Sequence, residues 1–238
     1  MSDTTANETH TELFSWRMEQ NVAVVKVRDR LLLRLADLTA KGMAVDHLQT
    51  FASTDSVRAM VILNPHQTSD KQEYLEILTT LKTQDSSFAA RLCNAANQII
   101  TQLAGLSKPV VAAGAGRIVS LLLNMGLAAD YRIVADDAVF VNPGLAMGLP
   151  SKGGAAFFLS RLIGTARAME FMLNQDEISA ETALAWGLVN KVVPFEELED
   201  AAISKAHEMG ELPQSVFGPI KKMVSGDLAK LKTCLEQE

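Results

Sequence analysis

The chain has little of several residue types, and each shortage excludes a class of protein. Its 238 residues include two cysteines, Cys93 and Cys234, which are too few for a disulfide framework or a cysteine-built zinc site. Its 22 basic residues are outnumbered by 28 acidic ones, so we expect no basic face for nucleic acid or an anionic membrane. No stretch reaches the ~18 apolar residues of a membrane span, and residues 1–10 do not form a signal peptide. We therefore expect a cytoplasmic protein with reduced thiols and no nucleic-acid or membrane partner.

The common motifs of catalysis and nucleotide binding are also missing from the sequence. No Gly-x-Gly-x-x-Gly follows a strand-like run, and there is no Gly-Lys-Ser/Thr, His-Glu-x-x-His or Gly-x-Ser-x-Gly. The four histidines do not have the spacing of metal ligands. We expect no bound metal and no cofactor.

Hydrophobic residues make up 48% of the chain and charged residues 21%, which is typical of a folded globular protein. Runs rich in β-branched residues alternate with helix-like segments, which predicts an α/β fold with a mostly parallel sheet. We expect a flexible tail at 1–15, a core at 16–195 and a short helical region at 196–238. The expected strands are 21–27, 57–63, 110–113, 131–135, 139–141 and 189–193. The expected helices are 28–41, 71–81, 88–106, 120–128, two within 153–174 that divide at Gly164, one from the cap Ser179 to Gly187, and a C-terminal set interrupted near 213–219.

One long block of the sequence carries several separate elements in a fixed order. They are Lys-Pro-Val-Val-Ala-Ala from 108, Leu-Ala-Ala-Asp-Tyr-Arg from 127, Phe-Val-Asn-Pro-Gly-Leu-Ala-Met-Gly-Leu-Pro from 140, Leu-Ser-Arg-Leu-Ile-Gly from 159, and Ile-Ser-Ala-Glu through Trp-Gly-Leu-Val-Asn-Lys-Val-Val-Pro over 178–194. Their order and spacing resemble the crotonase superfamily of enoyl-CoA hydratases and isomerases. The resemblance extends from about residue 21 to the C-terminus.

The resemblance implies a crotonase-like core of repeated ββα units in a spiral, followed by C-terminal helices. It also implies an acyl-CoA ligand and a homo-oligomer, either a trimer or a hexamer. The shared chemistry is an oxyanion hole, in which two backbone N–H groups hold the thioester oxygen while an enolate forms. One N–H group is expected from Leu121, in the turn that opens a helix. The other is expected from Ser69, in a loop that is shorter than usual, and Lys71 could meet a CoA phosphate; the alternative for this loop is a plain helix-capping turn.

The chain departs from the family where the chemistry takes place. The usual glycine triplet is replaced by 120–122, Ser-Leu-Leu. The two glutamates of the hydratases align with Asn124 and Gly144, and neither residue can exchange a proton near neutral pH. Asn124 could orient a water molecule without titrating, or it could be a satisfied amide in a pocket wall.

Two further polar residues are candidates. His66, in the altered loop, could act as an acid or base or be a solvated loop residue. Ser151, in the turn that lines the acyl pocket of relatives, could donate its hydroxyl or simply precede a helix. Asp130 and Arg132 belong to an element that we interpret as structural.

Three hypotheses of function follow. The first is an acyl-CoA enzyme that does not need the two glutamates, such as an isomerase, decarboxylase or thioester hydrolase. The second is a non-catalytic crotonase-fold protein that serves as a binding or assembly subunit. The third is an ordinary hydratase that uses Glu73 or Glu76 instead, and we rank it lowest.

Overall fold

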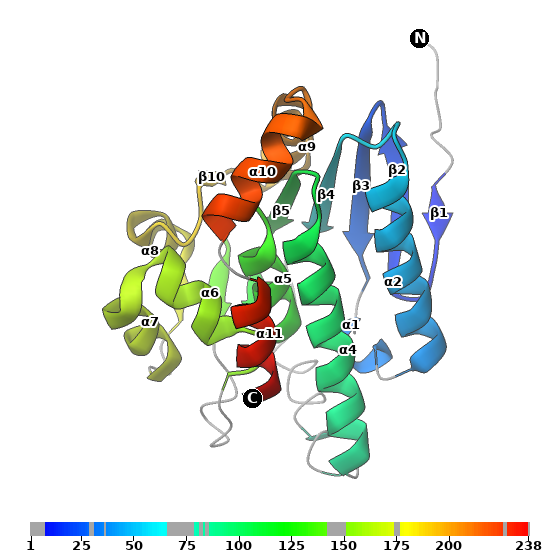
Figure 1. Ribbon diagram of the computed structural model, residues 1–238. Coiled ribbons are helices and arrows are strands. Elements are labelled where there is room, and N and C mark those ends of the chain that lie inside the picture. Colours follow the sequence, from blue (N-terminus) through cyan, green and yellow to red (C-terminus); the bar gives the residue numbers. More distant parts are fainter. Residues whose placement is uncertain are drawn as a thin grey trace.

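The computed structural model describes residues 8–28, 31–35, 37–65, 79–80, 83, 86–141, 151–173, 177–225 and 228–237 (Figure 1). Within them the main sheet has seven strands in the order β1-β2-β3-β4-β5-β7-β10. These strands are β1 Thr9–His10, β2 Phe14–Glu19, β3 Val22–Val27, β4 Ala59–Asn64, β5 Val110–Gly114, β7 Tyr131–Ala135 and β10 Lys191–Val193. Strands β3 to β10 pair in parallel, whereas β1 and β2 are antiparallel. The predicted α/β fold with a mostly parallel sheet is confirmed.

A second, smaller sheet in the described chain contains β6 Arg117–Val119, β8 Val139–Val141 and β9 Ile178–Ser179. Each of its first two strands follows directly on a strand of the main sheet, β6 after β5 and β8 after β7. The segment β5-β6-α5 is therefore a ββα unit, as the resemblance implied. The order of strands across the main sheet also differs from the strand order of a doubly wound dinucleotide-binding sheet.

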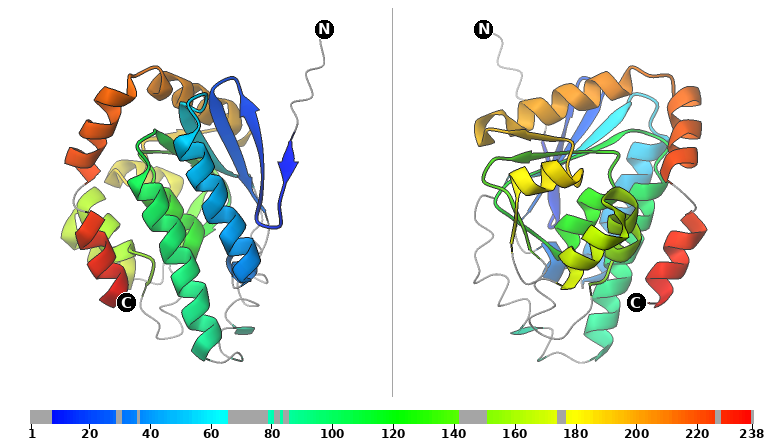
Figure 2. Two further views of the ribbon diagram at one scale, coloured as in Figure 1. Left: turned by 45° about the vertical axis from the view of Figure 1, so that its right-hand side comes forward. Right: turned by 90° about the vertical axis from the view of Figure 1, so that its left-hand side faces the viewer.

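Helices cover both faces of the main sheet. Their bounds are α1 Leu31–Arg34, α2 Leu38–Ser53, α4 Ser86–Gly105, α5 Ser120–Ala128, α6 Ala155–Leu162, α7 Gly164–Leu173, α8 Ala180–Trp186, α9 Leu198–Gly210, α10 Gln214–Ser225 and α11 Leu228–Gln237. Helices α2, α4 and α5 lie on one face, and α9 crosses the other (Figures 1 and 2). Along β4, Met60 and Ile62 belong to the first core and Val61 and Leu63 to the second. Burial on both faces explains why this strand is a continuous apolar run.

Several predicted boundaries are confirmed. Helix α5 spans Ser120–Ala128 as expected, although its N-cap is Val119 and not Ser120. The division at Gly164 is also observed, between α6 and α7. Helix α8 is capped by the Ser179 hydroxyl, which accepts from the N–H of Thr182, and it ends at Gly187.

Four predictions about the elements need correction or lie outside the description. The helix expected over 28–41 is two helices, because the carboxylate of Asp37 accepts from the N–H groups of Thr39 and Ala40 and begins α2. The expected tail at 1–15 contains β1 and the start of β2, which pairs with β3. The C-terminal interruption lies at 211–213, since Pro219 is inside α10. Most of the helix expected over 71–81 lies outside the described residues.

In the described part of the chain, no helix combines the length and apolar character needed to cross a bilayer.

Candidate active site around helix α5

The first turn of α5 presents backbone N–H groups that the side chain of its N-cap residue does not cap. Its N-cap, Val119, is extended, with φ −130° and ψ 156°, and makes no side-chain cap hydrogen bond. The first N–H groups of a helix have no intrahelical acceptor, and the helix dipole favours negative charge there. Leu121, the expected oxyanion donor, occupies the second position of this turn. The backbone arrangement therefore suits a partly negative oxygen.

The ends of two parallel strands are paired directly before this region. Asn64, the last residue of β4, lies opposite Gly114 of β5, and the N–H of Ala115 donates to the Asn64 carbonyl at 3.2 Å. The chain then enters β6 and α5, so the end of β4 and the start of α5 border the same apolar cavity. The candidates His66, Ser69 and Lys71, in the loop after β4, lie outside the described residues, as does Gly144. Their roles stay predictions.

Asn124 is the candidate that the structure describes best. It lies on α5 one turn after Leu121, and only 7% of the residue is exposed. Its Nδ2 atom donates to the carbonyl oxygen of Lys152 at 2.7 Å. Its Oδ1 atom is buried and has no hydrogen-bond partner among the described residues. The amide nitrogen is thus satisfied and the oxygen has no described partner, and the role of Asn124 stays a prediction.

A pair of glycines lets the turn before α6 approach Asn124. Gly153 and Gly154 have positive φ angles of 74° and 75°. A Cβ atom on Gly153 would lie 2.4 Å from Nδ2 of Asn124, and one on Gly154 would lie 2.9 Å from Cδ1 of Leu231. The half-buried Ser151 comes directly before Lys152, so the structure brings Ser151 and Asn124 into one region. Gly154 is the N-cap of α6, which fits the interpretation that this turn precedes a helix.

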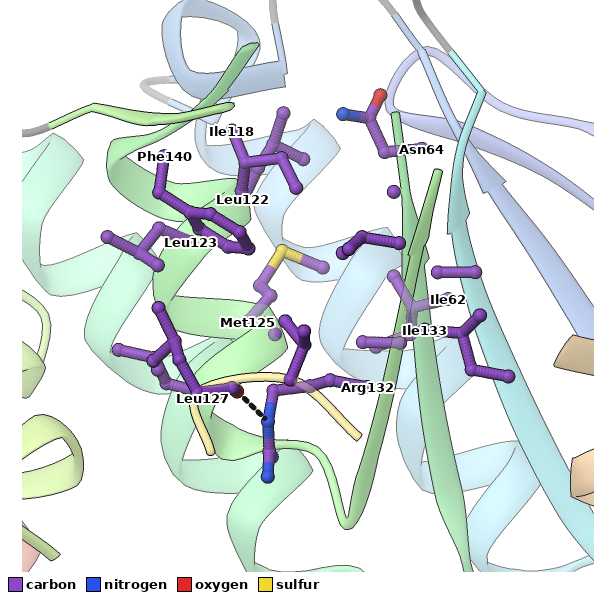
Figure 3. A pocket seen from close by; sticks show the side chains of 17 residues that line it. Ile62, Asn64, Ile118, Leu122, Leu123, Met125, Leu127, Arg132, Ile133 and Phe140 are labelled. Carbon is purple, nitrogen blue, oxygen red and sulfur yellow. Dashed lines mark hydrogen bonds between the residues drawn. The ribbon is translucent and has the colours of Figure 1, made fainter. Parts of the chain in front are cut away.

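The other side of α5 faces the sheet across a small apolar cavity of about 50 Å³ (Figure 3). Asn64, Ile118 and Leu122 lie at one end of it, Met125 lies in the middle and Arg132 at the other end. Among the described residues that line it, the only titratable side chain is that of Arg132. This cavity offers space for an apolar group and no acid or base for proton transfer.

A largely buried cluster of polar side chains follows the C-terminal end of α5. Oδ2 of Asp130 accepts from Nζ of Lys221 at 2.8 Å and from the N–H of Val110 at 2.9 Å. Burial raises the pKa of the Asp130 carboxyl, while Lys221 and the Val110 N–H oppose the rise. Arg132 donates to the carbonyls of Leu188 and Ala129, and burial lowers its pKa to about 10. These contacts support the structural interpretation of Asp130 and Arg132.

Two features of this region were not predicted from the sequence. The acceptor for Asn124 is a backbone carbonyl, which leaves no signal in the residue type of Lys152. The ion pair of Asp130 joins residues 91 positions apart in the chain, and Lys221 sits among ordinary helical residues. The paired glycines at 153 and 154 are visible in the sequence. Glycine adopts positive φ angles readily, so this pair is the signal that could have pointed to a close approach.

The fold and this helix-based site define the crotonase class of α/β proteins. The chain belongs to the enoyl-CoA hydratase/isomerase family, because that family's model matches residues 17–237.

Individual relatives agree with this assignment. The chain is 30% identical over 141 residues to 4-chlorobenzoyl coenzyme A dehalogenase-1 of an Arthrobacter species, covering 59% of this chain and 51% of the relative. It is 30% identical over 171 residues to the protein named probable enoyl-CoA hydratase EchA17 of Mycobacterium bovis, covering 72% and 64%. The matches thus span between half and two thirds of these curated relatives. The crystal structure of enoyl-CoA hydratase from Bacillus halodurans superposes with a TM-score of 0.81 at 21% identity, covering 94% of this chain and 91% of that one, which shows the shared fold.

Proposed function

We propose that this protein binds acyl-CoA thioesters and polarises the thioester carbonyl at the N-terminus of α5. The observation that carries the proposal is the first turn of α5, whose N-cap Val119 makes no side-chain cap hydrogen bond, at the position where the family resemblance puts the oxyanion donor. An N–H group fixed in a helix terminus stabilises developing negative charge without reorganising during the reaction. The Leu121 N–H is the donor in this proposal, and a second N–H, from Ser69, completes the pair.

The reaction is of a type that does not need the two hydratase glutamates. Asn124 cannot transfer a proton, and its amide N–H already holds the Lys152 carbonyl. Gly144 has no side chain. Oxyanion stabilisation without these groups corresponds to an isomerase or a decarboxylase, through an enolate, or to a thioester hydrolase, through a tetrahedral intermediate. The use of Asn124 to hold a turn also favours a second candidate, a non-catalytic acyl-CoA-binding or assembly subunit.

A proline substitution tests the donor directly. Proline lacks the backbone N–H and is tolerated in the first turn of a helix. Leu121→Pro should weaken binding of butyryl-CoA, measured by isothermal titration calorimetry, by about tenfold or more, as expected for a lost hydrogen bond. Leu121→Ala keeps the N–H and should bind as the wild type does. Ser120→Pro removes the neighbouring N–H and is the matched proline control.

Thermal unfolding of both proline variants separates folding from binding. Equal unfolding temperatures with weaker binding only in Leu121→Pro would support the proposal. Unchanged binding in a folded Leu121→Pro, or no binding of butyryl-CoA by the wild type, would overturn it.

We also propose that the protein is a cytoplasmic homo-oligomer, a trimer or hexamer. Support comes from an exposed apolar face on α10, where Val216, Ile220, Met223 and Val224 are 45–74% exposed. Light scattering at micromolar concentration should give a mass of three or six chains, and a monomer alone would contradict this.

A further inference from the structure

A second cavity, of about 250 Å³, lies beside the C-terminal end of α5, where α6 meets the junction of α10 and α11. Leu121 and Ala128 are seven residues apart on α5, or about 10 Å along its axis, so this cavity is separate from the proposed oxyanion site. An apolar cavity of about 150 Å³ is large enough to hold benzene, so this one admits a ring that carries a small substituent. Its apolar walls include Ala104, Phe157, Phe158, Leu162, Leu228 and Leu231.

Two aromatic rings and a guanidinium group form one wall of this cavity. The rings of Phe157 and Phe158 pack edge to face, with their centroids 5.3 Å apart and an angle of 85° between their planes. The guanidinium carbon of Arg161 lies 5.3 Å from the centroid of the Phe157 ring. Aromatic rings and guanidinium planes are surfaces on which another flat ring packs well. The wall therefore favours an aromatic ligand.

The charged groups around the cavity favour an anion. Among the described residues, which omit 226 and 227, the charged side chains in the lining are those of Asp130, Arg132 and Arg161. The Asp130 carboxylate pairs with Nζ of Lys221 at 2.8 Å, so its charge is compensated. The two guanidinium groups then leave a local excess of positive charge, although the whole chain carries −6. Such an excess attracts a negatively charged ligand.

Arg161 is placed to bind the anionic group. It is exposed, so its guanidinium group lies where the cavity meets solvent. Among the described residues it donates one hydrogen bond, from an Nη2 atom to the carbonyl oxygen of Val224 at 3.3 Å. A guanidinium group has five N–H donors, and its planar fork matches the two oxygens of a carboxylate.

We propose that this cavity is a binding site for a small aromatic carboxylate. The ring lies against Phe157 and Phe158, and the carboxylate accepts hydrogen bonds from Arg161. The ligand binds without covalent change. The site does not depend on the proposed function, because it lies at the other end of α5.

A carboxylate and its neutral amide test the proposal in the unmodified protein. Dissociation constants of benzoate and benzamide can be measured by ligand-observed NMR titration, without and with saturating butyryl-CoA. We expect benzoate to bind with a dissociation constant of about 1 mM or lower. It should bind about tenfold more tightly than benzamide, as expected for hydrogen bonds between charged groups, and butyryl-CoA should not displace it. A dissociation constant above that value, equal affinities for the two ligands, or displacement by butyryl-CoA would each overturn the proposal. Failure of butyryl-CoA to bind would overturn the proposed function and leave this test standing.

Variants link the binding to the cavity. Arg161→Gln should weaken benzoate about tenfold and change benzamide by less than about twofold. Arg167→Gln is the matched control, because Arg167 is also exposed and lies over an aromatic ring, 5.8 Å from the centroid of Trp186. It should keep the wild-type affinities.

A second variant changes the space and keeps the charge. Ala104→Leu narrows the cavity and should weaken both ligands. Thermal unfolding shows which variants are folded. A tenfold preference for benzoate in folded Arg161→Gln, or wild-type binding of both ligands in folded Ala104→Leu, would overturn the proposal. If Ala104→Leu does not fold, the change at the exposed Arg161 decides.

Discussion

Two largely buried polar side chains, Asn124 within helix α5 and Asp130 just past its end, differ in how their atoms are satisfied. In the middle of the helix, Asn124 donates to one backbone carbonyl and leaves its Oδ1 atom without a partner among the described residues. Just past the C-terminal end, Asp130 accepts from Lys221 and from the Val110 N–H, and the nearby Arg132 donates to two carbonyls. Only 7% of Asn124 and 13% of the Asp130 side chain are exposed, so exposure to solvent does not explain the contrast.

The difference lies in the segments that the two sets of hydrogen bonds join. At Asp130, the hydrogen bonds join β5 and α10, which are distant in sequence, so the cluster stabilises the packing of the C-terminal helices. At Asn124, the hydrogen bond holds a glycine turn and leaves an acceptor available beside the proposed oxyanion donor. Substitutions at Asp130 and Lys221 should therefore loosen the packing of the C-terminal helices, whereas substitutions at Asn124 should act on the glycine turn.

The largest effect on stability is expected at the Asp130 end. Lys221→Met leaves the buried carboxylate without its cation, and breaking a buried ion pair from one side costs about 3–5 kcal/mol. Urea unfolding would measure the loss of unfolding free energy. Lys222→Met, at the exposed neighbouring position, should change it by less than about 0.5 kcal/mol. A loss below about 1 kcal/mol in Lys221→Met would contradict the structural role of this pair.

A smaller loss is expected where the glycine turn meets Asn124. In Gly153→Ala, the alanine is strained by the positive φ of 74°, and its Cβ lies 2.4 Å from Nδ2 of Asn124. Together these effects should lower the free energy of unfolding by about 3 kcal/mol. Gly187→Ala is the matched control, because its φ is 78° and a Cβ there meets no atom within 4 Å. That change should cost only about 1 kcal/mol, from the backbone term. Equal losses in the two variants would mean that the turn does not press on Asn124.

The smallest of the three losses of unfolding free energy is expected from replacing the amide nitrogen of Asn124 by an oxygen. Asn124→Asp puts a carboxylate oxygen against the Lys152 carbonyl, which costs about 1–3 kcal/mol at pH 7. Burial and the facing carbonyl raise the pKa of this carboxyl in the folded state above its unfolded value of about 3.9. The folded state then binds more protons, so the variant is most stable relative to the wild type below about pH 4. It loses that stability as pH rises through the folded pKa.

Unfolding free energies of both proteins at pH 4 and pH 7 would show this trend. A deficit that is larger at pH 4 than at pH 7 would contradict the assigned orientation of the amide.

Much of the fold could be predicted from the sequence, because the strands of the main sheet are apolar on both faces and the family elements have a fixed order. The bounds of α5 and the division at Gly164 illustrate this. The split between α1 and α2 was missed because leucines at helical spacing continue across the cap at Asp37. The pairings of Asn124 with Lys152 and of Asp130 with Lys221 could not be predicted, since both depend on tertiary contacts between distant segments.

We propose that this protein keeps the oxyanion site of its family without the proton chemistry of a hydratase. Each general acid or base typically supplies about 10² to 10⁴-fold in rate, and the aligned positions carry Asn124 and Gly144. The most direct measurement is the steady-state loss of enoyl-thioester absorbance with crotonyl-CoA, alongside calorimetric binding of the same ligand. We expect binding with hydration several orders of magnitude below that of an ordinary hydratase. Turnover at the rate of an ordinary hydratase that survives Asn124→Ala would contradict the account.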